Sequence, residues 1–146
     1  MALFSFRPTN QRSDINMGLF LNGNGGGPAS LQIKRTLAPE WAMQSGVQLT
    51  WPHADTDWAY MLPEVTECYL RLAFEIATRQ TLLIVAPNTE EVRQLIEQRL
   101  PKRATENIRY YPCDTNDTWA RDHGFLTVMT NDGPELLDFR FNGWGG

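Results

Sequence analysis

The sequence predicts an α/β protein, because strand-like runs alternate with helical patterns from residue 47 onward. Residues 61–79 carry apolar side chains at three- and four-residue spacing, which is typical of an amphipathic helix. Thr81–Ala86 (TLLIVA) is a short continuous apolar run closed by Pro87, and such a run indicates a buried strand. A second helical pattern follows, so we expect helices that pack against a sheet.

The first 36 residues differ from the rest of the chain. Residues 22–28 read NGNGGGP, and a stretch of this composition can bury little surface. We therefore predict that residues 1–36 form a flexible N-terminal extension, with at most one short apolar patch at 17–21. Residues 37–146 are predicted to be globular.

The predicted elements of the globular part begin with a strand at 47–51, where VQLTW alternates before Pro52. The helix at 61–79 and the apolar strand come next. Asn88 or Thr89 is expected to cap the second helix, because both side chains can accept a hydrogen bond from a free backbone N–H. Pro101 is expected to end it.

The last third of the chain is predicted to be mostly strand. Strand-like runs lie at 107–112, 125–130 and 135–141. Residues 131–134 (NDGP) have the composition of a turn, so we expect the last two strands to pair as a hairpin.

The composition is that of one soluble globular domain, with 146 residues, 42% hydrophobic and 21% charged. A net charge of −4 argues against a general nucleic-acid binder, whose surface would be basic. No apolar run approaches the roughly 20 residues that span a bilayer, and the N-terminus lacks the apolar stretch of a secretory signal. We therefore expect a cytoplasmic protein with no nucleic-acid or membrane partner.

Neither a metal nor another cofactor is predicted. Cys68 and Cys113 are the two cysteines, and they have neither CxxC spacing nor Cys/His ligand spacing. The glycines at 23–27 lack both the pattern of a phosphate-binding loop and a preceding strand. Cys68 lies among the apolar positions of the first helix, so we expect it in the core.

Residues 116–124 (NDTWARDHG) form the most informative stretch of the chain. Charged, amide, imidazole, hydroxyl and indole groups gather there between two strand-like runs. Such a cluster either binds a charged group or forms a loop capped by its own side chains. An indole face and a carboxylate suit a planar cation, since the ring attracts the cation and the carboxylate accepts two parallel N–H bonds. On the cluster alone, both interpretations are open.

Several segments together resemble the agmatine deiminase and Porphyromonas-type peptidyl-arginine deiminase family. In the family's order they are PEW at 39–41, TWPH at 50–53, DW at 57–58, the stretch at 116–124 and FNGWGG at 141–146. The resemblance covers about residues 35–146 and only the N-terminal portion of the family's domain. It implies a pentein-type fold, an α/β propeller of ββαβ modules, of which this truncated chain holds the first part of the ring.

The resemblance also implies roles for individual residues. Family members hydrolyse a guanidinium to a ureido group and ammonia, by attack of a cysteine while a histidine moves protons. Trp119 is similar in position to the indole that packs against the substrate, and Asp122 to a carboxylate that pairs with the guanidinium. Asp117, Arg121 and Trp144 are expected to support the site, with Arg121 orienting a carboxylate.

No catalytic residue is expected in this chain, because the family's nucleophilic cysteine and its histidine lie downstream of the matching region. Gly124-Phe125 stands where the family usually has Gly-Pro, which is a local variation. Cys113 with His123 is an alternative pair for thiolate chemistry. We favour the simpler interpretation of Cys113 as a small apolar residue at a strand end.

Other notable side chains are predicted to be structural. His53 and His123 are expected to be hydrogen-bonded. Trp41, Trp51 and Trp58 are expected to be core or loop-anchoring aromatics, each with an indole N–H that needs one partner.

The resemblance implies a guanidino-group hydrolase that converts agmatine to N-carbamoylputrescine and ammonia in putrescine biosynthesis, or peptidyl-arginine to citrulline. Agmatine is favoured, because nothing in the sequence suggests export. The alternatives are an amidinotransferase-like pentein and a non-catalytic guanidine-binding or interaction module. The expected partner is a small cationic guanidino substrate. Exposed sheet edges in a partial ring favour self-association, so we also expect a homo-oligomer.

Overall fold

Two sheets form the frame of the computed structural model, which describes residues 2–4, 35–39, 41–140 and 142. The first sheet has four strands, in the order β1 (Ala2–Phe4), β3 (Gly46–Thr50), β4 (Thr81–Ala86) and β5 (Ile108–Pro112). The second has three, in the order β2 (Thr36–Leu37), β6 (Leu126–Thr130) and β7 (Gly133–Leu137). The β3–β4 and β4–β5 pairs are parallel, and the remaining pairs are antiparallel.

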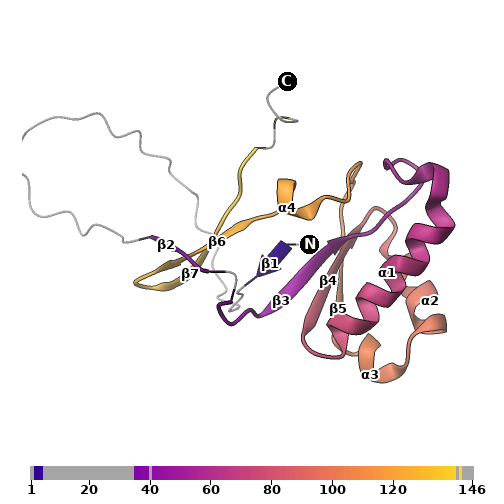
Figure 1. Ribbon diagram of the computed structural model, residues 1–146, viewed down its shortest axis with the longest axis horizontal. Helices are drawn as coiled ribbons and strands as arrows, with labels where there is room; N and C mark the ends of the chain where they lie inside the picture. Colours follow the sequence, from indigo (N-terminus) through magenta and orange to yellow (C-terminus); the bar gives the residue numbers. More distant parts are fainter. Residues whose placement is uncertain (1, 5–34, 40, 141, 143–146) are drawn as a thin grey trace, which may run out of the picture.

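The helices supply the connections that a parallel sheet requires. In chain order they are the 3-10 turn η1 (Ala59–Met61), α1 (Leu62–Ala77), α2 (Thr89–Arg99), α3 (Lys102–Thr105) and α4 (Ala120–His123). Figure 1 shows α1, α2 and α3 on one face of the first sheet, with α4 and the second sheet away from them. The alternation of β3, α1, β4, α2 and β5 confirms the predicted α/β class.

The core lies between β4 and the helices. Leu82 and Ile84 of β4 are fully buried in the same cluster as Ala73 and Ala77 of α1. Leu83 points to the opposite face of the sheet, because side chains alternate along a strand, and there it packs against Ala120. Both faces of β4 are thus covered, which explains why its sequence is continuously apolar.

The burial of Cys68 in α1 differs from the prediction. Leu70 is buried together with Ala73 and Ala77, whereas Leu72 is 40% exposed and Cys68 is exposed. The prediction of Cys68 as a core residue is therefore wrong. The apolar residues of α1 cover more than half of its circumference, so their spacing predicts a helix but does not decide which of them meet the sheet.

The ends of the chain differ from the prediction in several places. Ala2–Phe4 forms β1, a strand that the sequence pattern did not predict. The apolar patch proposed at 17–21 lies outside the described residues. The predicted hairpin is confirmed by the antiparallel β6–β7 pair, although β7 ends at Leu137. Gly133 has φ +121°, a left-handed conformation that glycine adopts readily at the end of the turn.

The cap of α2 provides a test of local stability. Asn88 accepts a hydrogen bond from the Glu91 backbone N–H (3.2 Å), and its amide donates to the Glu91 carboxylate (3.2 Å). We expect Asn88→Ala to lower the free energy of unfolding by about 1 kcal/mol, because a free N–H loses its acceptor. Gln98→Ala on the exposed side of α2 is the control, with an expected change within about 0.5 kcal/mol. Equal losses for the two variants in urea unfolding would contradict the cap.

Candidate functional site

The 116–124 stretch forms a tight turn that leads into α4. The Asp117 carboxylate accepts a hydrogen bond from the Trp119 backbone N–H (2.9 Å). The Asp122 N–H then donates to the Trp119 carbonyl (2.8 Å), and the Gly124 N–H donates to the Ala120 carbonyl (2.8 Å). Trp119 thus stands at the N-cap of the single helical turn that carries Asp122.

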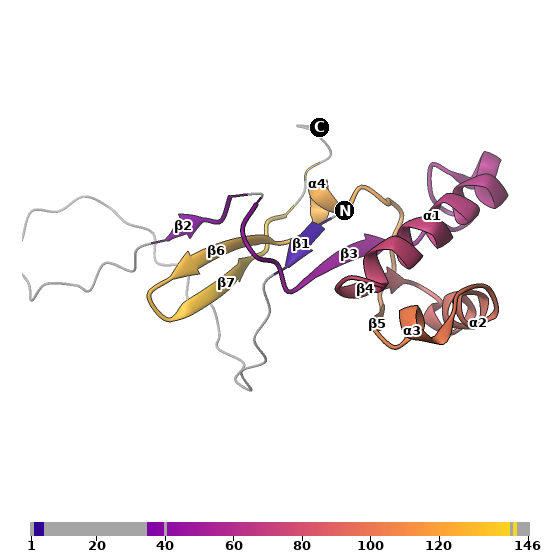
Figure 2. The same ribbon diagram turned by 60° about the horizontal axis from the view of Figure 1, so that its bottom comes forward.

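Ala120 holds this turn against the rest of the molecule. It is fully buried, and Leu83 of β4 and Leu136 of β7 pack against it. Figures 1 and 2 show α4 where the second sheet meets the first, away from α1 and α2. Because Ala120 has only a methyl group, the backbone of α4 can lie close to both sheets, and the longer side chains around it extend outward.

Trp119 is paired with a second indole from a distant part of the sequence. The rings of Trp58 and Trp119 lie 6.3 Å apart between centroids, tilted by 39°. The Trp58 indole N–H donates to the Thr118 hydroxyl (2.8 Å), which confirms the prediction of Trp58 as a loop-anchoring aromatic. Trp119 itself is 53% exposed, so part of its ring is open to a ligand.

Two charged side chains of the motif are open to solvent. Asp122 and Arg121 are both exposed, and among the described residues none buries the Asp122 carboxylate. An exposed ion pair contributes only about 0–1 kcal/mol, so Asp122 in this chain alone would hold a cation weakly. The orientation of a carboxylate by Arg121 stays a prediction. Trp144 lies outside the described residues.

The histidines have different surroundings. The Nε2 atom of His53 lies 3.1 Å from the Thr115 hydroxyl oxygen, and its Nδ1 atom accepts a hydrogen bond from the Asp55 backbone N–H (3.3 Å). The predicted hydrogen-bonded role of His53 is therefore confirmed. His123 differs, because its Nε2 is buried and has no hydrogen-bond partner among the described residues, so the same prediction is wrong for that nitrogen.

The other residues singled out from the sequence also differ in their surroundings. Trp51 is buried in the core as predicted, whereas Trp41 is 88% exposed and the prediction of a core or anchoring role for it is wrong. Cys113 is exposed after the end of β5, and its thiol lies 3.5 Å from the Asp114 carbonyl oxygen. Nothing in these contacts favours Cys113 as a nucleophile over a strand-end residue.

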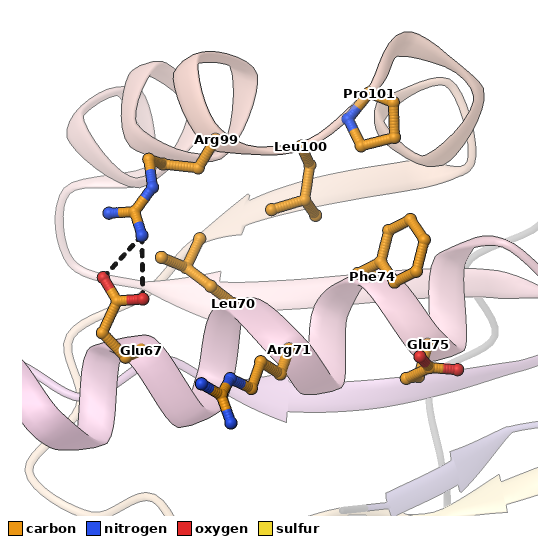
Figure 3. A pocket seen from close by; sticks show the side chains of 8 residues that line it. All are labelled: Glu67, Leu70, Arg71, Phe74, Glu75, Arg99, Leu100 and Pro101. Carbon is orange, nitrogen blue, oxygen red and sulfur yellow. Dashed lines mark hydrogen bonds and ion pairs between the residues drawn. The ribbon is translucent and has the colours of Figure 1, made fainter.

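A groove of about 560 Å³ lies away from this motif, between α1 and the segment that joins α2 to α3 (Figure 3). Leu70, Phe74 and Leu100 are among its apolar lining. Arg99 and Glu67 form an ion pair (2.8 Å) at one side. The groove contains none of the side chains that the sequence predicts for the site.

The part of the chain that the structure describes has neither a metal-binding cluster nor a membrane-spanning helix. No group of three or more His, Cys, Asp and Glu side chains is placed to hold a metal ion there. No helix in the same ranges has the length and apolar character needed to cross a membrane.

Known structures share this arrangement of sheets and helices. The chain superimposes on a substrate-bound C. jejuni agmatine deiminase carrying a cysteine-to-serine substitution, with a TM-score of 0.69 and 29% identity, covering 82% of this chain and 34% of that one. It also superimposes on a Porphyromonas gingivalis protein assigned as an arginine deiminase, with a TM-score of 0.65 and 46% identity, covering 77% and 32% of the two chains. The predicted pentein-type fold, of which this chain holds a part, is thereby confirmed.

Sequence comparisons agree with the structural ones. The agmatine deiminase of Pseudomonas putida KT2440 is 32% identical over 111 residues, and the match covers 73% of this chain and 28% of the relative. The chain thus spans less than a third of the length of that relative. The profile of Porphyromonas-type peptidyl-arginine deiminases matches residues 36–146. By its sequence and its fold, the chain belongs to the Porphyromonas-type peptidyl-arginine deiminase family.

Proposed function

We propose that the protein carrying this segment is a guanidino-group hydrolase that converts agmatine to N-carbamoylputrescine and ammonia. The observation that carries the proposal is that Trp119, at the N-cap of α4, and Asp122, within α4, are joined by a backbone hydrogen bond and are both exposed. The agmatine deiminases among the relatives support the choice of substrate. The product is a precursor of putrescine, so we place the reaction in putrescine biosynthesis in the cytoplasm.

The chemistry of the two side chains suits a guanidinium. The exposed part of the Trp119 indole offers a ring face to a planar cation, and the Asp122 carboxylate can accept two of its N–H bonds. The ureido group of the product is neutral, so this end of the molecule loses the attraction of both groups and can leave. Asp117 supports the arrangement by holding the Trp119 backbone. In this assignment the described residues bind the substrate, and attack on the guanidino carbon belongs to a cysteine outside this chain.

We expect the 146-residue chain on its own to release no ammonia from agmatine. The reason is that the only cysteines, Cys68 and Cys113, lie outside the candidate site motif. The comparison is made with an extended protein, defined as a version of this protein that spans the full length of its relatives. We expect the extended protein to release ammonia from agmatine. Ammonia release by the short chain that is lost in Cys113→Ala would contradict the prediction and identify Cys113 as the nucleophile.

The ammonia-release assay also distinguishes the alternative substrate and the alternative function. Ammonia release from a peptidyl-arginine substrate but not from agmatine would replace the proposed substrate. Agmatine binding to the extended protein without ammonia release would instead favour a non-catalytic guanidine-binding module. The open position of Trp119 and Asp122 in this chain is the one observation that favours such a module.

A further inference from the structure

Thr118 is a buried polar residue in a motif whose Trp119, Arg121 and Asp122 side chains are exposed. Its exposed fraction is 7%, against 53% for the neighbouring Trp119. A buried hydroxyl requires hydrogen-bond partners, and the Thr118 hydroxyl accepts from the Trp58 indole N–H at 2.8 Å. Trp58 lies 60 positions earlier in the sequence, just before η1. The hydroxyl therefore ties the motif to the connection that follows β3.

A second contact extends this link to α1. An indole N–H can only donate, so Thr118 keeps its own proton for another acceptor. Burial raises the pKa of Tyr69 on α1, and the nearby Thr118 side chain partly offsets that rise. The Tyr69 ring in turn packs edge-on against the buried Trp51, at 5.6 Å between centroids. Thr118 thus joins Trp58 to a rigid part of the core.

The position of Trp58 matters for Trp119. The two rings lie 6.3 Å apart and are tilted by 39°. About half of Trp119 is exposed, and the Trp58 ring lies against the covered part of the residue. Trp58 is therefore well placed to set the orientation of the Trp119 ring.

We propose that Thr118 is a positioning residue, whose buried hydroxyl holds Trp58 against Trp119 and so sets the ring face that Trp119 presents to a guanidinium. The positioning of the two rings stands on the geometry alone. The guanidinium part rests on the function proposed above. Thr118 acts through its neighbours and touches no substrate in this proposal.

The test compares Thr118→Val, which keeps the shape and removes the hydroxyl, with Thr118→Ser, which keeps the hydroxyl. The electronic transitions of two indole rings at this separation couple to each other. The coupling produces a pair of bands, here called the signal, in the far-UV circular dichroism spectrum. Loss of the signal in both Trp58→Phe and Trp119→Phe assigns it to this pair. We expect Thr118→Val to lose most of the signal and Thr118→Ser to retain it. An unchanged signal in a folded Thr118→Val variant, checked by its thermal transition, would overturn the proposal.

Kinetics of the extended protein supply a second readout. We expect Thr118→Val to raise the KM for agmatine about two- to fivefold, no more than the loss expected when the Trp119 ring itself is replaced by phenylalanine, with kcat changed by less than about twofold. Thr118→Ser should restore the wild-type KM. If Thr118→Val does not fold, Trp58→Phe removes the same hydrogen bond from the other side and should raise KM similarly.

The outcomes separate the two proposals. A KM change that is equal in Thr118→Val and Thr118→Ser, or a loss confined to kcat, would contradict positioning by the hydroxyl. A different result would be the expected dichroism changes together with a wild-type extended protein that neither binds nor hydrolyses agmatine. That result would contradict the proposed function and leave the positioning of Trp119 established.

Discussion

Asp122→Asn is expected to lower the kcat/KM of the extended protein for agmatine a hundredfold or more. The amide keeps the shape of the carboxylate but removes the charge that offsets the guanidinium, and its NH2 group would face another donor. Loss of a charged hydrogen bond in a desolvated site costs about 2–5 kcal/mol, which is roughly thirtyfold to several thousandfold in rate, and the expected loss lies within that range. In the 146-residue chain, where Asp122 is exposed, the same substitution should change agmatine binding less than about fivefold.

Trp119→Phe and Asp132→Asn complete this experiment. Phenylalanine keeps an aromatic face with a weaker attraction for cations, so a loss of about 1 kcal/mol, or roughly fivefold, is expected. Asp132 is an exposed aspartate in the β6–β7 turn, and its substitution should leave activity unchanged. The order of the losses is decisive. If Trp119→Phe lost more activity than Asp122→Asn, Asp122 would be a loop-capping residue rather than the guanidinium partner.

Ile84→Ala is expected to lower the free energy of unfolding by about 2–5 kcal/mol. Ile84 is 0% exposed and lies in β4, which has β3 on one side and β5 on the other. Truncation there leaves a cavity that strands held on both sides cannot easily close. Ile84→Val removes one methylene group and should cost only about 0.5–1.5 kcal/mol. Urea unfolding of the two variants measures both values.

Leu72→Ala on α1 is the matched control for this experiment. Leu72 is 40% exposed, so its truncation should cost less than about 1 kcal/mol. A loss as large as that of Ile84→Ala would show that the outer face of α1 is buried in solution. The predicted homo-oligomer would then be the first explanation to examine, by measuring whether the loss depends on protein concentration.

Local features of the fold could be predicted from the sequence, because their causes lie within a few neighbouring residues. The continuous apolar run of β4, the Asn88 cap of α2 and the β6–β7 turn are examples. Short elements were missed where the local pattern is weak. The single-turn helix α4 lies in a polar stretch that also has the composition of a loop, and it forms where buried Ala120 packs against both sheets.

The sequence by itself determined that Trp119 and Asp122 belong to one motif, and its resemblance to deiminases indicated what that motif could bind. Only the tertiary structure decided which face of α1 meets the sheet, how open Asp122 is, and that Trp58 reaches Thr118 and Trp119. A motif of adjacent residues depends on local geometry, which the sequence encodes directly. Contacts between residues 60 positions apart depend on how strands and helices dock, and docking is set by the packing of the whole core.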